Sequence, residues 1–169
     1  MLMRTRRREH DDDFTAFVVA AAPRLRRVAY LMCRDWHLAQ DLTQTTLARM
    51  YASWARVRRA DNLEAYARRV LINALADQRG RRSSGEIVLA EMPEQPRADD
   101  SPELHVTLLA ALATLPVRDQ AIVVLRHWED QSVETVAEIL GVSVSVVKMQ
   151  NARSLTRLRA LLGEDFAMS

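Results

Sequence analysis

One segment of the chain limits most strongly how it can fold. Residues 83–103 (SSGEIVLAEMPEQPRADDSPE) hold three of the five prolines, three serines and six acidic residues. Proline interrupts helices, and this composition favours an extended linker. The sequence therefore predicts a charged tail over residues 1–13 and two modules, residues 14–82 and 104–163, joined by a flexible acidic linker.

Both modules have the composition and the periodicity of helical bundles. The 169 residues include only 4 glycines, while hydrophobic residues make up 49% of the chain. Apolar residues recur at helical spacing and predict helices near residues 13–33, 36–55 and 62–80, with Asp13 and either Asp61 or Asn62 as N-caps. Pro23 is expected to kink or divide the first helix. The predicted fold class is all-α.

Charge is distributed unevenly along the chain. Residues 1–82 contain 17 basic and 9 acidic residues, whereas residues 104–169 contain 6 basic and 7 acidic residues. The basic part suits a polyanionic partner. The second module has too little positive charge to bind DNA strongly by itself, because phosphate attraction dominates non-specific affinity.

The second module ends in a helix-turn-helix pattern. Ser132 is predicted to cap a short helix, Gly141 to form a tight turn, and Ser143 to cap a longer helix. In this motif the second helix normally enters the major groove of DNA. The face predicted to be exposed there carries Ser145, Met149, Gln150, Arg153 and Thr156, and it is flanked by Lys148 and Arg157. An ordinary solvated helix face fits the same pattern.

The stretch EAYARRVLINALADQRGRR, residues 64–82, presents an unusual polar stripe. Tyr66, Arg69, Asn73 and Asp77 share one face of the predicted helix, opposite an ordinary apolar face. An aromatic ring can stack on a base, a carboxamide can read a base edge, and a guanidinium can hold the phosphate backbone. Soluble helix positions are the alternative interpretation of this stripe.

Taken together, four stretches resemble a known family. DFTAFVVAAAPRLRRVAYLM, HLAQDLTQTTLARMYASW, NLEAYARRVLINALADQRGRR and the segment from LATLPVRDQ to RLRALL resemble, in this order, regions 2 and 4 of bacterial RNA polymerase sigma factors. The resemblance is to the extracytoplasmic-function (ECF) group of the sigma-70 family. It implies a subunit that binds core RNA polymerase, reads two promoter elements and assists strand opening.

The resemblance assigns roles to three sets of residues. For the single strand of the −10 element they are Tyr66, Arg69, Val70, Asn73, Asp77, Trp54, Arg58 and Arg59. For the duplex −35 element they are Ser145, Lys148, Met149, Gln150, Arg153 and Arg157. For polymerase binding they are Asp41, Leu42, Gln44, Thr45 and Met50. Gln40 and Thr45 stand where the family usually has glutamate.

The resemblance also implies the partners: the clamp helices and flap of core polymerase, promoter DNA, and an anti-sigma factor as a further candidate. No cofactor, metal site or catalytic centre is expected, because Cys33 is the sole cysteine and the four histidines are scattered. No apolar run is long enough to span a membrane. The expected location is the cytoplasm.

Two alternatives to a sigma factor remain at this point. A conventional helix-turn-helix regulator would bind duplex DNA tightly without polymerase, and its affinity would depend steeply on salt. An interaction protein would sequester polymerase or another factor without supporting initiation.

Overall fold

The computed structural model describes residues 1–83 and 102–163, and every regular element in these two ranges is a helix. The predicted all-α fold is therefore confirmed, whereas most of the predicted linker lies outside the described residues. The helices are α1 (Leu2–Cys33), α2 (Trp36–Ala52), α3 (Trp54–Val57), α4 (Leu63–Ser83), α5 (Pro102–Ala113), α6 (Val117–His127), α7 (Val133–Leu140) and α8 (Val144–Leu162). Residues 1–83 are called the N-terminal half below, and residues 102–163 the C-terminal half.

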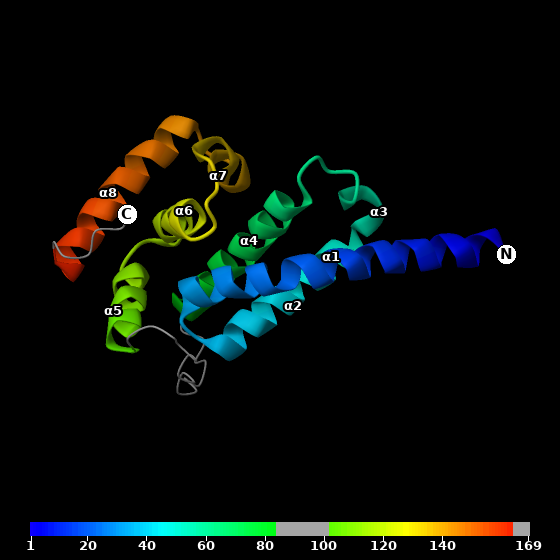
Figure 1. Ribbon diagram of the computed structural model, residues 1–169, viewed down its shortest axis with the longest axis horizontal. Helices are drawn as coiled ribbons and strands as arrows, with labels where there is room; N and C mark the ends of the chain where they lie inside the picture. The colour runs from blue at the N-terminus through cyan, green and yellow to red at the C-terminus, as the bar shows by residue number, and fades with distance from the viewer. Residues whose placement is uncertain (84–101, 164–169) are drawn as a thin grey trace.

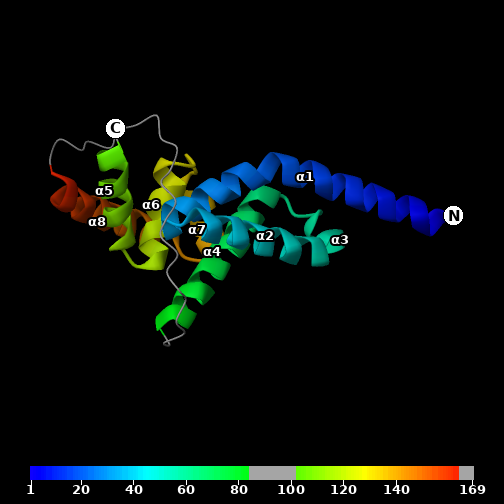
Figure 2. The same ribbon diagram turned by 90° about the horizontal axis from the view of Figure 1, so that it is seen from below.

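The first helix is longer than predicted. It begins at Leu2, so residues 2–13 are helical and Asp13 is not an N-cap. Part of the extension contacts the end of α2: the Asp11 carboxylate accepts a hydrogen bond of 2.7 Å from the Tyr51 hydroxyl, and the Phe14 ring lies 4.9 Å from the Tyr51 ring. Residues 1–9 are exposed. Figures 1 and 2 place the free end of α1 at one extreme of the molecule and α8 at the other.

The sequence predicted that Pro23 would either kink or divide the first helix, and Pro23 does not divide α1. The helix is continuous from Leu2 to Cys33 with Pro23 inside it. Both Pro23 and Val19, whose carbonyl would accept the missing N–H bond, lie on the exposed side of the helix. Water can therefore solvate the unpaired carbonyl, and the helix tolerates the proline there.

The N-termini of α4, α7 and α8 are capped by the residues that the sequence predicted. The Asn62 side chain accepts from the Ala65 N–H at 3.0 Å at the start of α4. Ser132 accepts from the Thr135 N–H at 3.1 Å, and Ser143 from the Val146 N–H at 3.2 Å. Gly141 ends α7 in the left-handed conformation, with φ of 65°. These contacts confirm the helix-turn-helix motif of α7 and α8.

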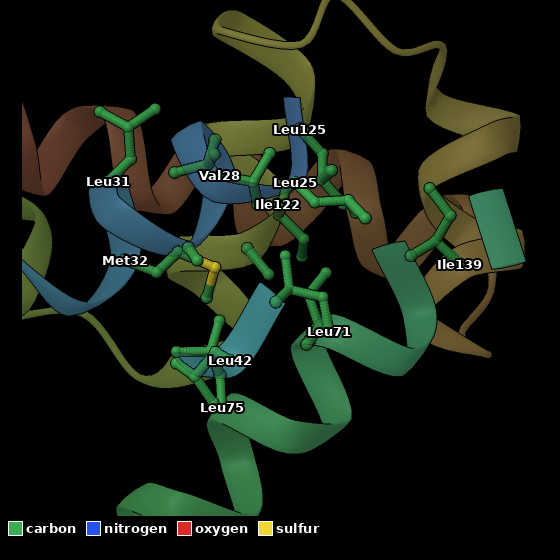
Figure 3. Packing of buried hydrophobic residues seen from close by; sticks show 14 of the residues in the cluster. Leu25, Val28, Leu31, Met32, Leu42, Leu71, Leu75, Ile122, Leu125 and Ile139 are labelled. Atoms are coloured by element: carbon green, nitrogen blue, oxygen red, sulfur yellow. The ribbon is translucent and has the colours of Figure 1, made fainter. Parts of the chain in front are cut away.

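The two halves share one hydrophobic core. Buried residues from α1, α2, α4, α6 and α7 belong to a single cluster, and Figure 3 shows Leu25 and Val28 of α1 beside Ile122 and Leu125 of α6. All four side chains are almost fully buried. The sequence predicted two helical modules, and the structure adds that they pack directly against each other.

Candidate nucleic-acid interface

The polar stripe on α4 borders an open cavity. Arg69, Asn73 and Asp77 are exposed, and Tyr66 and Val70 are half-buried. Tyr66, Val70 and Asn73 line a cavity of about 230 Å³ together with two residues from the end of α2. A ring, an apolar edge and a carboxamide therefore meet at one solvent-accessible hollow, which suits a planar base with polar edges.

The two residues from α2 are Arg49 and Ser53, which the sequence did not single out. Arg49 lies in the last turn of α2, and Ser53 is the residue that follows the helix. Both lie in the stretch HLAQDLTQTTLARMYASW, to which the family resemblance assigns polymerase binding. Their proximity to Asn73 depends on how α2 packs on α4, and no spacing within either helix indicates it.

Trp54 is not available at the surface, which corrects its predicted role. It is 2% exposed and packs against Phe14 and Phe17, with ring centroids 5.1 and 5.4 Å away. A large aromatic ring at the junction of three helices is more stable in the core than in water. The two predicted arginines of this segment, Arg58 and Arg59, are exposed.

Arg58 has an acidic partner on α1. Its guanidinium forms an ion pair with the Asp13 carboxylate, and both side chains are largely exposed. A surface pair of this kind contributes about 0–1 kcal/mol, so Arg58 can exchange Asp13 for a phosphate at little cost.

Nearby, the hydrogen bond that the Tyr51 hydroxyl donates to Asp11 raises the pKa of Tyr51, because the neutral phenol is the form that donates.

The N-terminal end of the α4 stripe faces the C-terminal half. Tyr66 and Arg69 line a second cavity, of about 150 Å³, with Glu138 and Ile139 of α7 on its other side. One end of the stripe is thus open to solvent at Asn73, while the other is bordered by an acidic side chain of the helix-turn-helix motif.

The second helix of that motif presents most of the predicted residues. Ser145, Lys148, Met149 and Arg157 are exposed on α8, and Met149 is among the most exposed large apolar residues. Arg153 is exposed too and lies 3.6 Å from the Asp119 carboxylate. This convex face has the size and chemistry to enter a major groove.

Gln150 does not belong to that face, which corrects its predicted exposure. It is 6% exposed, and its side-chain oxygen accepts a hydrogen bond of 3.1 Å from Arg118 Nε of α6. The carboxamide therefore joins α8 to α6. The next residue, Asn151, is half-buried and its side-chain oxygen hydrogen-bonds to His127 Nε2 at 3.1 Å.

Two families of known proteins match the chain, largely one in each half. Residues 17–84 match the family Sigma-70 region 2, and residues 111–160 match the family Sigma-70, region 4. The chain belongs to the sigma-70 family.

Its relatives within the sigma-70 family include members of the ECF group. The chain is 37% identical over 150 residues to the RNA polymerase sigma-E factor of Streptomyces coelicolor, covering 87% of this chain and 84% of that protein. It is 32% identical over 154 residues to the ECF RNA polymerase sigma factor SigE of Mycolicibacterium smegmatis, covering 85% and 59% of the two chains. These relatives confirm the resemblance found in the sequence.

A solved structure shares the arrangement of both halves. The co-crystal structure of the sigma factor RpoE in complex with the anti-sigma factor NepR from Bartonella quintana matches with a TM-score of 0.72 at 26% identity. The match covers 90% of this chain and 98% of that one. Such coverage includes the helices of both sigma regions.

The surface of α2 that the sigma-70 resemblance assigns to polymerase is only partly accessible. Asp41, Gln44 and Thr45 are exposed, as expected. Leu42 and Met50 are buried, at 6% and 1% exposure, which corrects their predicted place on the polymerase-binding surface. Their hydrophobic side chains contribute to the core beneath this surface, where burial stabilises the fold.

Two kinds of feature are absent from the part of the chain that the structure describes: a metal-binding cluster and a membrane-spanning helix. Within residues 1–83 and 102–163, no three His, Cys, Asp or Glu side chains gather as a metal site would require. The Cys33 thiol donates to the Asp35 carbonyl at 3.2 Å. None of the described helices combines the length and the apolar character needed to cross a membrane.

Proposed function

We propose that this sigma factor reads the opened −10 strand with the α4 stripe and the −35 duplex with the exposed face of α8, while the exposed residues of α2 bind core RNA polymerase. The observation that carries the proposal is the open cavity lined by Tyr66, Val70 and Asn73. Membership of the sigma-70 family favours this function over a conventional helix-turn-helix regulator.

In this proposal Asn73 reads the edge of an extruded base and Tyr66 stacks on it. Removing a base from the stack costs a few kcal/mol, and stacking on an aromatic ring returns about 1–3 kcal/mol. Arg69 and Asp77, at the two ends of the exposed stripe, contact the flanking nucleotides. Arg49 and Ser53 join the set because they line the same cavity.

On α8 we assign duplex contacts to Ser145, Lys148, Met149, Arg153 and Arg157, all exposed. Arg153 can pair with a guanine edge through two hydrogen bonds, and Lys148 can neutralise a phosphate. On α2 we assign polymerase contacts to Asp41, Gln44 and Thr45. The clamp helices of the largest subunit and the flap are the partner surfaces that the family resemblance implies.

Further parts of the proposal concern organisation and setting. We assign residues 14–82 to sigma region 2, residues 104–163 to sigma region 4 and residues 83–103 to an acidic linker between them. The protein acts without catalysis of its own, in the cytoplasm, where polymerase and promoter DNA are found. An anti-sigma factor is a candidate partner, since the similar solved structure contains one.

The decisive experiment combines the purified protein with core polymerase and genomic DNA, and sequences the transcripts. A sigma factor is expected to produce defined new start sites that core polymerase alone does not produce. Absence of such start sites would reject the proposal. If the protein instead binds polymerase and suppresses transcription, it is a sequestering protein.

A further inference from the structure

The first turn of α6 contacts α8 through two adjacent residues. Arg118 Nε donates to the Gln150 side-chain oxygen at 3.1 Å, and the Asp119 carboxylate lies 3.6 Å from Arg153 Nη2. Gln150 and Arg153 are three residues apart on α8, so their side chains are neighbours on the helix surface. The first contact joins the two helices inside the fold, whereas the second reaches an exposed residue that we assign to DNA binding.

The two members of the Asp119–Arg153 pair differ strongly in exposure. The Asp119 side chain is 10% exposed, whereas the Arg153 side chain is 65% exposed. A buried carboxylate needs a partner that offsets its loss of water. Within the described ranges, Arg153 supplies the ion pair of Asp119. The pair therefore links a carboxylate at the edge of the core to a long side chain on the exposed face of α8.

Arg153 differs in this respect from the two cations that flank it on α8. Lys148 and Arg157 are exposed, and neither forms an ion pair with another residue of the described ranges. A long side chain without a partner samples many rotamers, and ordering it on binding costs free energy. Arg153 avoids part of this cost, because Asp119 already restricts the position of its guanidinium.

The pairing with Asp119 leaves Arg153 able to contact a base. A guanidinium has five N–H donors in a planar fork, and the carboxylate lies nearest to only one of its nitrogens, Nη2. The remaining donors suffice for the two acceptors of a guanine edge, O6 and N7. Because the fork is rigid, a carboxylate that holds one nitrogen also sets the direction of the others.

We propose that Asp119 is a positioning residue that sets the base preference of Arg153: its carboxylate directs the guanidinium fork toward a guanine edge without touching DNA itself. This inference rests on the function proposed for α8. An arginine that is not held can turn to a phosphate instead, which adds affinity but no sequence preference. Neither helical spacing nor the family resemblance singled out Asp119, since its contact with α8 arises from the packing of two helices.

Two simpler roles of Asp119 predict different results. Asp119 lies in the first turn of α6, where an acidic residue stabilises a helix through its dipole. If that were its whole role, substitution would lower stability and weaken binding to all duplexes alike. If its charge only repelled phosphates, substitution would strengthen binding to all duplexes alike. Only a positioning role changes the ratio of affinities between duplexes, so this ratio is the decisive measurement.

The test uses the full chain assembled with core polymerase. Competition between promoter duplexes, substituted one base pair at a time in the −35 element, measures the ratio of affinities for the preferred and the substituted sequence. Asp119→Asn removes the carboxylate with little change of shape. Glu134→Gln is the matched control, because Glu134 is an exposed acidic residue in the first turn of α7 and its substitution removes the same charge.

We expect Asp119→Asn to reduce the ratio roughly threefold at the base pair that Arg153 reads, less than Arg153→Ala does, because the guanidinium is still present. Asp119→Glu, which keeps a carboxylate, should recover part of the ratio, and Glu134→Gln should leave it unchanged. In an Arg153→Ala background, Asp119→Asn should change the ratio no further, because the side chain that it positions is gone.

Two results would overturn the inference. A wild-type ratio in folded Asp119→Asn, whatever its melting temperature, would mean that Asp119 has only a structural role. An equal loss with and without Arg153 would mean that Asp119 acts through another group. Asp119→Ser, which also lacks the charge, is the test variant if Asp119→Asn does not fold.

Failure of the proposed function has a different signature. If Arg153→Ala itself keeps the wild-type base preference, the role assigned to α8 is wrong and the inference about Asp119 fails with it. If Arg153→Ala changes the preference and Asp119→Asn does not, only the inference about Asp119 is wrong.

Discussion

The two proposed DNA-binding surfaces differ in how they are built. The α4 stripe borders two cavities and depends on neighbours from α2 and α7. The helix α8 lies at one extreme of the molecule, and its exposed residues Arg153 and Lys148 line neither cavity. A concave site is suited to receiving a base that has left the duplex, whereas a convex helix is suited to a groove that remains intact.

The two surfaces therefore depend differently on the packing of the halves. Glu138 of α7 lines the cavity that Tyr66 and Arg69 also border, so this end of the α4 stripe is shared between the halves. The exposed residues of α8 line neither of the two cavities. Substitutions on α4 should therefore affect strand opening, and substitutions on α8 should affect duplex binding.

The largest effect is expected for Asn73→Ala. We expect promoter opening in the presence of core polymerase to fall roughly 100-fold, the upper end of what losing one hydrogen-bonding partner of a buried group costs (about 1–3 kcal/mol). Permanganate footprinting of unpaired thymines measures the opening. Binding to core polymerase and to the −35 duplex should be unchanged.

The matched control for this substitution is Gln78→Ala, which removes a carboxamide from the same helix outside the cavity. A template that is already unpaired at the −10 element should recover part of the activity of Asn73→Ala, because part of the opening cost is then absent. Equal opening by both variants and wild type would contradict the role of Asn73.

Arg153→Ala should have the next largest effect. We expect a loss of about tenfold in affinity for the preferred −35 duplex, within the 1–3 kcal/mol of a two-pronged contact with a base pair, and a relaxed preference at one base pair. Competition with duplexes substituted one pair at a time measures both. Uniform weakening on all duplexes would indicate a phosphate contact instead.

Gln150→Ala should behave differently although it lies on the same helix. Its carboxamide accepts from Arg118 Nε inside the C-terminal half. We expect a loss of about 1 kcal/mol of unfolding free energy, equivalent to a melting temperature about 2–4 °C lower, with the same base preference. A changed base preference at unchanged stability would place Gln150 back on the DNA-binding face.

The smallest effect is expected for Lys148→Ala. If Lys148 contacts one phosphate, the slope of log affinity against log salt for duplex binding should fall by about 0.9. Salt titration of the polymerase complex on promoter DNA measures this slope. Thr156→Ala, at an exposed position of the same helix, serves as the control and should leave the slope unchanged.

Much of the local structure could be predicted, because local structure follows from short-range chemistry. Asn62, Ser132 and Ser143 cap helices where a side-chain oxygen precedes an apolar period, and Gly141 forms the left-handed turn. The exposed stripe of Arg69, Asn73 and Asp77 follows from helical spacing alone. Four ordered motifs were enough to identify the family.

Predictions failed where a side chain had partners from elsewhere in the chain. Trp54 and Gln150 looked like surface residues, but Phe14 and Phe17 cover the first and Arg118 binds the second. The predicted helix start at Asp13 was also wrong, and His10 and Asp11, just before it, contact Tyr51 from the end of α2. No pattern within a single helix contains this information.

Short-range patterns in the sequence are enough to predict a helical chain, a basic part and a nearly neutral part, and the helix faces that bear polar groups. The cavity that Arg49 and Ser53 share with Asn73, and the burial of Glu129 against Arg27 and Arg68, result from the packing of distant segments. Helix formation depends on neighbours a few residues apart, whereas cavities and buried ion pairs depend on side chains that only the packing of distant segments brings together.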